Sequence, residues 1–273
     1  MDKYSVLMSL YIKEKPEYLD QAIHSMVNQT LKPDEIVIVK DGLITNELQN
    51  VLEKYNNKYP DLFHIVGYED NRGLGNALNY GLTYCKNELV ARMDTDDIAV
   101  IDRCEKQIDF MKKHPEITVV GGEIEEFMND IENSIGKRLV PCSDIEIKKY
   151  MKKRCPFNHM TVMFKKNEII EAGNYMDWHY NEDYYLWIRL ALLEKKFANL
   201  EDILVHVRVG DDMYKRRGGY AYFISEKNIQ KLMLDKKMIN LYRYFVNVVE
   251  RLVVQIFMPN SIRKFVFRVL ARK

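Results

Sequence analysis

Glycine, proline and cysteine are scarce in this sequence, and charge of neither sign is in excess. The 273 residues include 12 glycines and 7 prolines, which excludes collagen-like and low-complexity chains. The 41 basic and 40 acidic side chains leave a formal net charge of +1, so the basic excess of a general nucleic-acid binder is missing and we expect no nucleic-acid partner. A hydrophobic fraction of 47% excludes an intrinsically disordered chain.

The 4 cysteines are spread along the chain, and none belongs to a Cys-x-x-Cys pair, which argues against a zinc site and against a disulfide framework. Reduced thiols of this kind are typical of a cytoplasmic protein. The first residues show no basic segment followed by an apolar run, so we expect no export signal. No run reaches the roughly 18 apolar residues that a membrane-spanning helix needs.

Apolar runs and amphipathic segments alternate along residues 1–121. Short apolar runs predict strands at 4–10, 35–40, 62–68, 88–93 and 117–121. Helical spacing of apolar residues predicts helices at 17–30, 48–55, 74–85 and 100–113. This alternation predicts an α/β fold with a parallel sheet and right-handed crossovers.

The rhythm changes after residue 121. We expect residues 123–141 to be irregular, residues 143–153 and 183–194 to be helical, and residues 160–165 to form a strand. No glycine- or serine-rich linker separates the two halves. We therefore expect one domain over residues 1–215, with a first half at 1–121 and a second half at 122–215.

The last part of the chain predicts a helical extension over residues 216–273. Residues 220–258 have helical spacing, and Pro259 ends the expected helix. One stripe of that helix is polar and consists of Arg243, Asn247, Glu250, Arg251 and Gln255.

Residues 261–273 form a basic amphipathic segment with no acidic residue, which is typical of a helix on a membrane surface. Its basic side chains are Arg263, Lys264, Arg268, Arg272 and Lys273. The alternative is a helix that packs on its own domain or on a second copy of the chain, as in a homodimer. We expect a cytoplasmic protein held peripherally at the inner face of the cell membrane through this segment.

Four expected strands end in polar residues. These ends are Ser9 with Tyr11 and Glu14, Asp41-Gly42, residues 70–73, and residues 94–97. Ligands of open α/β sheets bind beyond the carboxyl ends of the strands. Four polar ends in register predict one polar cleft.

The most specific of these motifs is Asp94-Thr95-Asp96-Asp97. A buried strand delivers three carboxylates within four residues, and such crowding raises at least one pKa unless a counter-charge is present. A divalent cation relieves the repulsion, and Mg²⁺ or Mn²⁺ suits these oxygen ligands. The alternative is an acidic turn that caps the next helix.

Two further motifs have both a structural and a functional interpretation. Residues 71–77 (Asn-Arg-Gly-Leu-Gly-Asn-Ala) predict a turn into a helix whose amides favour phosphate, although they match neither the dinucleotide fingerprint nor the P-loop. Glu182 and Asp183 begin a helix, where the helix dipole favours acids; alternatively they place a general base in the cleft. Trp187 then either stacks on a sugar or packs below it.

The ordered set of motifs resembles glycosyltransferase family 2, the inverting enzymes with the GT-A fold, over about residues 4–215. The set is far more specific than any one motif, and it is most similar to bacterial enzymes that build capsule, exopolysaccharide or O-antigen. The resemblance implies a three-layer, Rossmann-like nucleotide-diphospho-sugar transferase fold with a mixed central sheet. Segments 5–14, 39–42, 71–79, 92–97 and 181–189 carry the similarity.

The resemblance also implies roles for the matching residues. Asp183 would be the catalytic base, and Asp94 and Asp96 would hold Mg²⁺ or Mn²⁺. A lysine at position 40 departs from the family pattern beside Asp41, the residue expected to bond uracil. The nucleotide-sugar would contact Ser9, Tyr11, Glu14, Asp41, Asn71, Arg72, Asn76, Arg92, Asp94 and Thr95.

Other matches to the family are weaker. His159, Glu182 and Trp187 would lie on the acceptor side, and a structural role for His159 fits equally well. His206 and Arg208, near an expected strand end, would contact the diphosphate late in the reaction. Lys215, Arg216 and Arg217 fall where the family has a loop over the diphosphate; alternatively they are a solvated charge run.

The resulting expectation is a metal-dependent inverting glycosyltransferase. It would move a sugar from a nucleotide-sugar, expected to be a UDP-sugar, to a hydroxyl of a glycan or lipid-linked glycan in cell-surface polysaccharide synthesis. One alternative is a sugar nucleotidyltransferase, although residues 9–15 lack the glycine-rich loop of that class. Another alternative is a binding protein that has the same fold but no catalytic activity. The presence of three aspartates argues against it: Asp94, Asp96 and Asp183.

Overall fold

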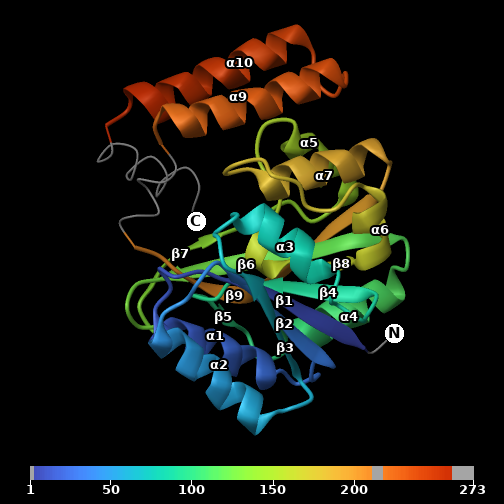
Figure 1. Ribbon diagram of the computed structural model, residues 1–273. Coiled ribbons are helices and arrows are strands. Elements are labelled where there is room, and N and C mark those ends of the chain that lie inside the picture. The colour runs from blue at the N-terminus through green and yellow to red at the C-terminus, as the bar shows by residue number, and fades with distance from the viewer. Residues whose placement is uncertain (1–2, 211–217, 260–273) are drawn as a thin grey trace.

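The computed structural model describes residues 3–210 and 218–259. In this part of the chain a mixed sheet forms the centre, with the strand order β3-β2-β1-β4-β8-β6-β9-β5, and β7 pairs with β6 outside that path (Figure 1). No helix in the described ranges is long and apolar enough to cross a membrane.

The parallel half of the sheet agrees with the sequence prediction. β1 pairs in parallel with β2 and β4, and β2 pairs in parallel with β3. Most residues of β1, β2 and β4 are buried, as their apolar runs require. The strands are β1 (Tyr4–Leu10), β2 (Glu35–Asp41), β3 (Phe63–Tyr68) and β4 (Leu89–Met93).

The second half of the sheet is richer in strands than the sequence predicts. β8 is antiparallel to both β4 and β6, and β9 runs parallel to β6. The strands are β5 (Ile98–Ala99), β6 (Ile117–Phe127), β7 (Ser134–Arg138), β8 (Met163–Lys165) and β9 (Lys196–Arg208).

The expectation of irregular structure at residues 123–141 was wrong. β6 continues to Phe127 and pairs with β7. Near its end β6 alternates between the half-buried Glu123 and Glu125 and the buried Ile124 and Glu126, as a strand with one covered face does. In the sequence, this alternation is short and does not stand out as a hydrophobic pattern.

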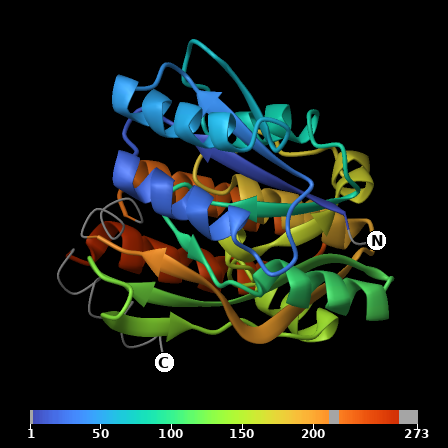
Figure 2. The same ribbon diagram turned by 90° about the horizontal axis from the view of Figure 1, so that it is seen from below.

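Helices cover both faces of the sheet and complete three layers. α1 (Pro16–Val27), α2 (Asn46–Lys58) and α4 (Arg103–Lys113) pack on one face, and α1 and α2 lie in front of the strands in the view from below (Figure 2). The helices on the other face are α3 (Leu74–Leu82), α5 (Asp144–Met151), α6 (Lys166–Glu171) and α7 (Glu182–Leu192).

The helical segment expected at 220–258 is a hairpin of two helices. α9 (Tyr220–Asp235) packs on the body through Ile229 and Met233, and α10 (Leu241–Leu252) lies outside it, followed by a π-helical turn (Val253–Phe257) (Figure 1). The turn between the helices holds Lys237 at a φ of 59°.

Three members of the polar stripe, Asn247, Arg251 and Gln255, are buried and face inward, whereas Arg243 and Glu250 are exposed. Asn247 donates to the carbonyl of Lys152 at 2.8 Å and to Gln230 at 2.7 Å. Arg251 donates to Glu226 at 2.5 Å and to the carbonyl of Lys153. These buried polar contacts hold the hairpin on the body. The pairing of Arg251 with Glu226 offsets the free-energy cost of removing both charges from water.

We expect Arg251→Met to destabilise the protein by about 3 kcal/mol, because it leaves the buried carboxylate of Glu226 without its partner. Thermal and urea unfolding of the full chain measure the loss. Replacing both partners, Glu226→Met with Arg251→Met, should recover most of it, since the buried unpaired charge is then gone. The exposed Val249→Ala is the control and should change the free energy of unfolding by about 0.5 kcal/mol or less. Equal stability of Arg251→Met and the wild type would contradict the prediction.

Candidate active site

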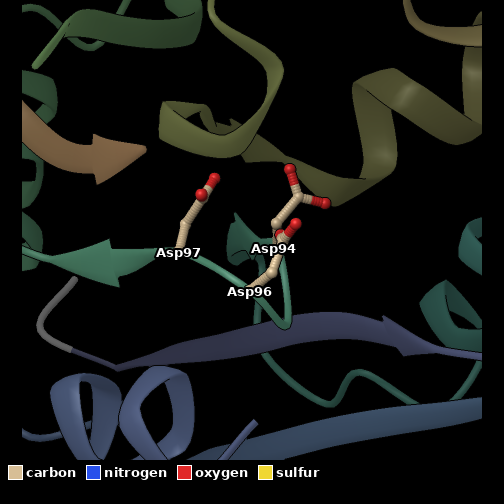
Figure 3. Close-up of side chains that lie close together, drawn as sticks. All are labelled: Asp94, Asp96 and Asp97. Carbon is tan, nitrogen blue, oxygen red and sulfur yellow. The ribbon is translucent and has the colours of Figure 1, made fainter. Parts of the chain in front are cut away.

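Three aspartates gather where β4 ends and the chain turns toward β5. One carboxylate oxygen each from Asp94, Asp96 and Asp97 lies within 4.8 Å of the others (Figure 3). Asp97 is buried, whereas Asp94 and Asp96 are partly open to solvent. The sequence motif therefore folds into a compact group of carboxylates with an accessible side.

Crowding and burial disfavour the charged forms of these acids. Burial, followed by the charges of Asp94 and Glu14, raises the pKa of Asp96 to about 7. Burial and the neighbouring Asp96 and Asp94 raise the pKa of Asp97 well above its usual range. Such a donor set fits a divalent cation, because a cation removes the repulsion and prefers carboxylate oxygens. Asp94 and Asp96, the two accessible members, would hold Mg²⁺ or Mn²⁺.

A buried arginine lies beside the aspartates. Arg92, on β4, donates from Nη2 to Asp94, while its buried Nε and Nη1 have no hydrogen-bond partner in the part of the chain that the structure describes. Arg103 donates to the main-chain carbonyl of Arg92 at 2.7 Å and so fixes the strand at this point. These two nitrogens of Arg92 are available for a charged ligand or for bridging water.

Two side chains connect the segment that follows β1 with the turn at residues 94–97, which we call the aspartate turn. Thr95 donates to Glu14 at 2.9 Å, and its hydroxyl also lies 3.4 Å from the carbonyl oxygen of Ser9. Burial raises the pKa of Glu14. Tyr11 is exposed in the same connection. Ser9, Glu14 and Thr95 are thus brought together as the sequence predicts, although their contact with a nucleotide remains a prediction.

Asp41 anchors the loop at residues 70–73. Its carboxylate accepts from the main-chain N–H of Arg72 at 2.7 Å, from that of Gly73 at 3.1 Å, and from the amide of Asn71 at 3.0 Å. Gly42 has a φ of 91°, and a Cβ there would lie only 2.9 Å from the nitrogen of Asn71. Asp41 therefore shapes the loop as well as being the predicted uracil ligand.

The loop side chains are oriented locally. The Arg72 guanidinium lies 4.4 Å from the centre of the Tyr68 ring, and Asn76 donates to the carbonyl of Arg72 at 2.8 Å. Asn71 and Arg72 are exposed beside Asp41, as a nucleotide-sugar contact requires.

Asp183 lies in the first turn of α7 with restricted solvent access. Its carboxylate accepts from the N–H of Tyr184 at 2.7 Å, and the Cys155 thiol lies 3.5 Å from its other oxygen. Burial raises the pKa of Asp183, and raises that of Glu182 to about 7, where the charge of Asp183 adds to the effect. A carboxylate with a raised pKa is a stronger base than a solvated one.

Two contacts at this helix start have no signal in the sequence. A Cβ on Gly75 would lie 3.1 Å from the Cβ of Glu182, so α3 and α7 touch where the glycine-rich motif begins its helix. Cys155 reaches Asp183 although 28 residues separate them. Neither pairing follows from spacing, because only the tertiary fold brings the segments together.

Electrostatic coupling joins the two acidic groups. The charge of Arg92 interacts with Asp94 and Asp97, and it also lowers the pKa values of Glu182 and Asp183. The positive charge of Arg92 therefore acts on both the aspartate turn and the Glu182-Asp183 pair.

His159 and Trp187 lie below this region. Trp187 is fully buried, with its ring centre 5.2 Å from that of Phe157, so it packs below the site and offers no face for stacking on a sugar. His159 is bonded to the hydroxyl of Tyr175 at 3.0 Å, and burial together with the charge of Arg92 lowers its pKa well below the usual value.

The end of β9 brings Arg208 to the aspartates. Its main-chain N–H donates to Asp97 at 2.9 Å, and its Nε donates to the carbonyl of Asp96 at 3.2 Å. The guanidinium lies 3.9 Å from the centre of the Tyr18 ring. His206 lies instead beside Glu125, with 3.3 Å between Nδ1 and a carboxylate oxygen. Lys215, Arg216 and Arg217 lie outside the described residues.

The chain is similar to bacterial sugar-transferring enzymes. It is 42% identical to the amylovoran biosynthesis glycosyltransferase AmsE of Erwinia amylovora, over 97% of each chain. It is 37% identical to an Escherichia coli protein named UDP-Gal:alpha-D-GlcNAc-diphosphoundecaprenol beta-1,3-galactosyltransferase, over 99% of this chain and 97% of the relative.

Solved structures share the fold. Residues 1–349 of Staphylococcus aureus TarS, in complex with UDP-GlcNAc, match 92% of this chain and 72% of that one with a TM-score of 0.67 and 18% identity. A mannosyltransferase from Pyrobaculum calidifontis, in complex with GDP-Man and Mn²⁺, matches 98% of this chain and 80% of that one with a TM-score of 0.62 and 14% identity.

The model of the family described as glycosyl transferase family 2 matches residues 5–171, which include the Asp94–Asp97 turn and the loop anchored by Asp41. This match covers more than half of the chain, and it agrees with the mixed sheet and with both relatives. The chain is therefore a glycosyltransferase of family 2 with the GT-A fold.

Proposed function

We propose that this glycosyltransferase moves a sugar from a UDP-sugar to a hydroxyl of a lipid-linked glycan during cell-surface polysaccharide synthesis. The observation that carries the proposal is the charge of the buried Arg92, which donates to Asp94 in the aspartate turn and also acts on the Glu182-Asp183 pair. In the proposed reaction, a donor diphosphate and an acceptor hydroxyl meet between these two groups. The name of the relative that acts on a diphosphoundecaprenol-linked sugar supports this acceptor class.

On the donor side, the residues bind and neutralise the diphosphate. Asp94 and Asp96 would hold Mg²⁺ or Mn²⁺, which when bound stabilises negative charge on the leaving diphosphate. The unpartnered N–H groups of Arg92 offer further positive charge at the same place. Ser9, Glu14 and the loop held by Asp41 bind and orient the nucleoside.

On the acceptor side, Asp183 acts as the general base. It takes the proton of the acceptor hydroxyl as the hydroxyl oxygen attacks the anomeric carbon, while the bond to the diphosphate breaks on the opposite face. A single base and no enzymatic nucleophile give inversion at that carbon. The Cys155 thiol and the N–H of Tyr184 hold the carboxylate in place.

The division of the chain follows from these roles. Residues 1–215 form the catalytic domain, in which 1–121 bind the donor and 122–215 the acceptor. Residues 216–273 form an extension that holds the enzyme peripherally at the inner face of the cell membrane. The described part of this extension, α9 and α10, packs against α5 and α7 of the acceptor half.

Asp183→Asn should lower the rate of UDP release from a UDP-sugar in the presence of acceptor by about 10²- to 10⁴-fold, because the amide cannot take the proton. Binding of the UDP-sugar, followed by calorimetry, should be retained, since Asp183 lies on the acceptor side. Asp109→Asn, an exposed position on α4, is the matched control and should keep the wild-type rate. Near wild-type turnover by Asp183→Asn would remove Asp183 as the base, and silence of the wild type across common UDP-sugars with acceptor extract would remove the proposed reaction.

Mn²⁺ should bind about tenfold more weakly at pH 6 than at pH 8. The free Asp96 carboxyl, with its pKa of about 7, is largely protonated at pH 6, and protons then compete with the cation. Calorimetric titration of the nucleotide-free protein measures the affinity. Asp96→Asn should bind the cation weakly and lose most of this pH dependence. An affinity that does not change between pH 6 and pH 8 would refute the role of Asp96.

A further inference from the structure

α10 is the outermost helix of the described part of the chain (Figure 1). It turns apolar side chains toward solvent. Six of these side chains are between 47% and 78% exposed to solvent, whereas large apolar side chains are most often buried. We call them the α10 apolar face, and they are Leu241, Tyr242, Phe245, Val249, Val253 and Phe257.

The α10 apolar face is a continuous stripe. Five of its members recur every fourth residue from Leu241 to Phe257, so they follow one another along one side of the helix. The charged side chains of this segment are Arg243 and Glu250, at the edges, and Arg251, which points inward to Glu226. The exposed half of the helix between those edges carries no charge.

The dimensions of the stripe indicate a surface partner. Sixteen residue steps of about 1.5 Å give a length of about 24 Å on a convex helix, which is unsuited to enclosing a small molecule. Continuous apolar patches of this kind mark contacts with proteins or membranes. The stability of the hairpin does not depend on the α10 apolar face, because the buried contacts of the hairpin are on the opposite side of α10.

We propose that the α10 apolar face inserts into the surface of a membrane that contains anionic lipids. The next segment of the sequence, residues 261–273, carries five basic side chains and no acid, so its charge is complementary to anionic headgroups. The exposed aromatic rings of Tyr242 and Phe257 lie near the two ends of the stripe and suit the membrane interface.

A second copy of the chain is the less favourable partner. A symmetric dimer through this face would place the same surface of both copies in contact. The segment at residues 261–273 has five basic side chains and no acid, so a second copy brings only charge of the same sign in this segment. Anionic lipid brings the opposite charge.

The helical hairpin also connects the membrane face with the catalytic base. Ser225, on α9, donates to the carbonyl of His179 at 2.6 Å and accepts from Asn181 at 3.0 Å, just before Asp183. Membrane docking would therefore fix the distance between Asp183 and the lipid surface. This consequence rests on the proposed lipid-linked acceptor, whereas membrane docking itself does not.

The test compares two double variants of the full chain. Phe245→Glu with Val249→Glu places two charges in the α10 apolar face, and Ile101→Glu with Ile170→Glu makes the same change at exposed positions outside it. Co-sedimentation with vesicles of phosphatidylglycerol and phosphatidylethanolamine measures binding. We expect the first variant to bind at least about tenfold more weakly than the wild type, and the second to bind as the wild type does.

Folding and charge have their own controls. Circular dichroism checks the fold of both double variants, and Phe245→Gln with Phe257→Gln repeats the test without adding charge. High salt, or vesicles of neutral phosphatidylcholine, should weaken wild-type binding. Equal vesicle binding by the wild type and both variants of the face would overturn the proposal, as would a wild type that does not bind anionic vesicles.

Two further measurements separate the other outcomes. Sedimentation velocity without lipid would overturn the proposal if it showed a dimer that Phe245→Glu with Val249→Glu dissociates. On a short, lipid-free acceptor this variant should keep the wild-type rate of UDP release, and on the same acceptor in vesicles it should be slower. If the wild type turns over neither acceptor, the proposed reaction fails, while the vesicle experiment still decides the membrane contact.

Discussion

The repulsion among carboxylates at the end of one buried strand is the constraint on which the site depends. β4 delivers Asp94, Asp96 and Asp97 into a space that is partly closed to water, where burial and mutual charge raise the pKa values of the last two. Arg92 offsets part of this charge, but it is itself buried, and two of its nitrogens have no hydrogen-bond partner among the described residues. Within the described residues, the negative charge of the aspartates is not fully neutralised, and Arg92 is not fully hydrogen-bonded. A diphosphate with a bound cation would supply the positive charge that the aspartates need and the hydrogen-bond acceptors that Arg92 needs.

The surrounding fold keeps this unfavourable arrangement in place. Arg103 bonds to the carbonyl of Arg92, and the N–H of Arg208 bonds to Asp97, so elements on both sides of the turn hold it. Asp41 fixes the neighbouring loop through two main-chain N–H groups. The hydrophobic core on each face of the sheet makes these positions rigid, and a rigid polar site needs little reorganisation when charge develops.

Much of this site could be predicted from the sequence, because parallel strands with buried faces leave clear apolar runs and end at one edge of the sheet. The Asp94–Asp97 turn and the convergence of Ser9, Glu14 and Thr95 follow from that rule. The contact between Cys155 and Asp183 does not, since it depends on how distant segments pack. β7 was missed as a strand, and only the end of β9 near Arg208 was expected, for a related reason: the short or interrupted alternation of these strands gains its meaning only from the partner strand.

The C-terminal helices show a different limit of sequence patterns. Periodicity identifies two faces of α10 but not which one turns inward, and the usual rule would bury the apolar side. Asn247 and Arg251 instead find buried partners in Gln230 and Glu226, and these contacts compensate the loss of water that burial imposes on them. Exposure of the α10 apolar face to water is unfavourable for the folded protein. The basic segment that follows this face in the sequence suggests that a membrane surface covers it. For an enzyme whose acceptor is attached to lipid, membrane binding through the α10 apolar face would restrict the search for the acceptor to the membrane surface.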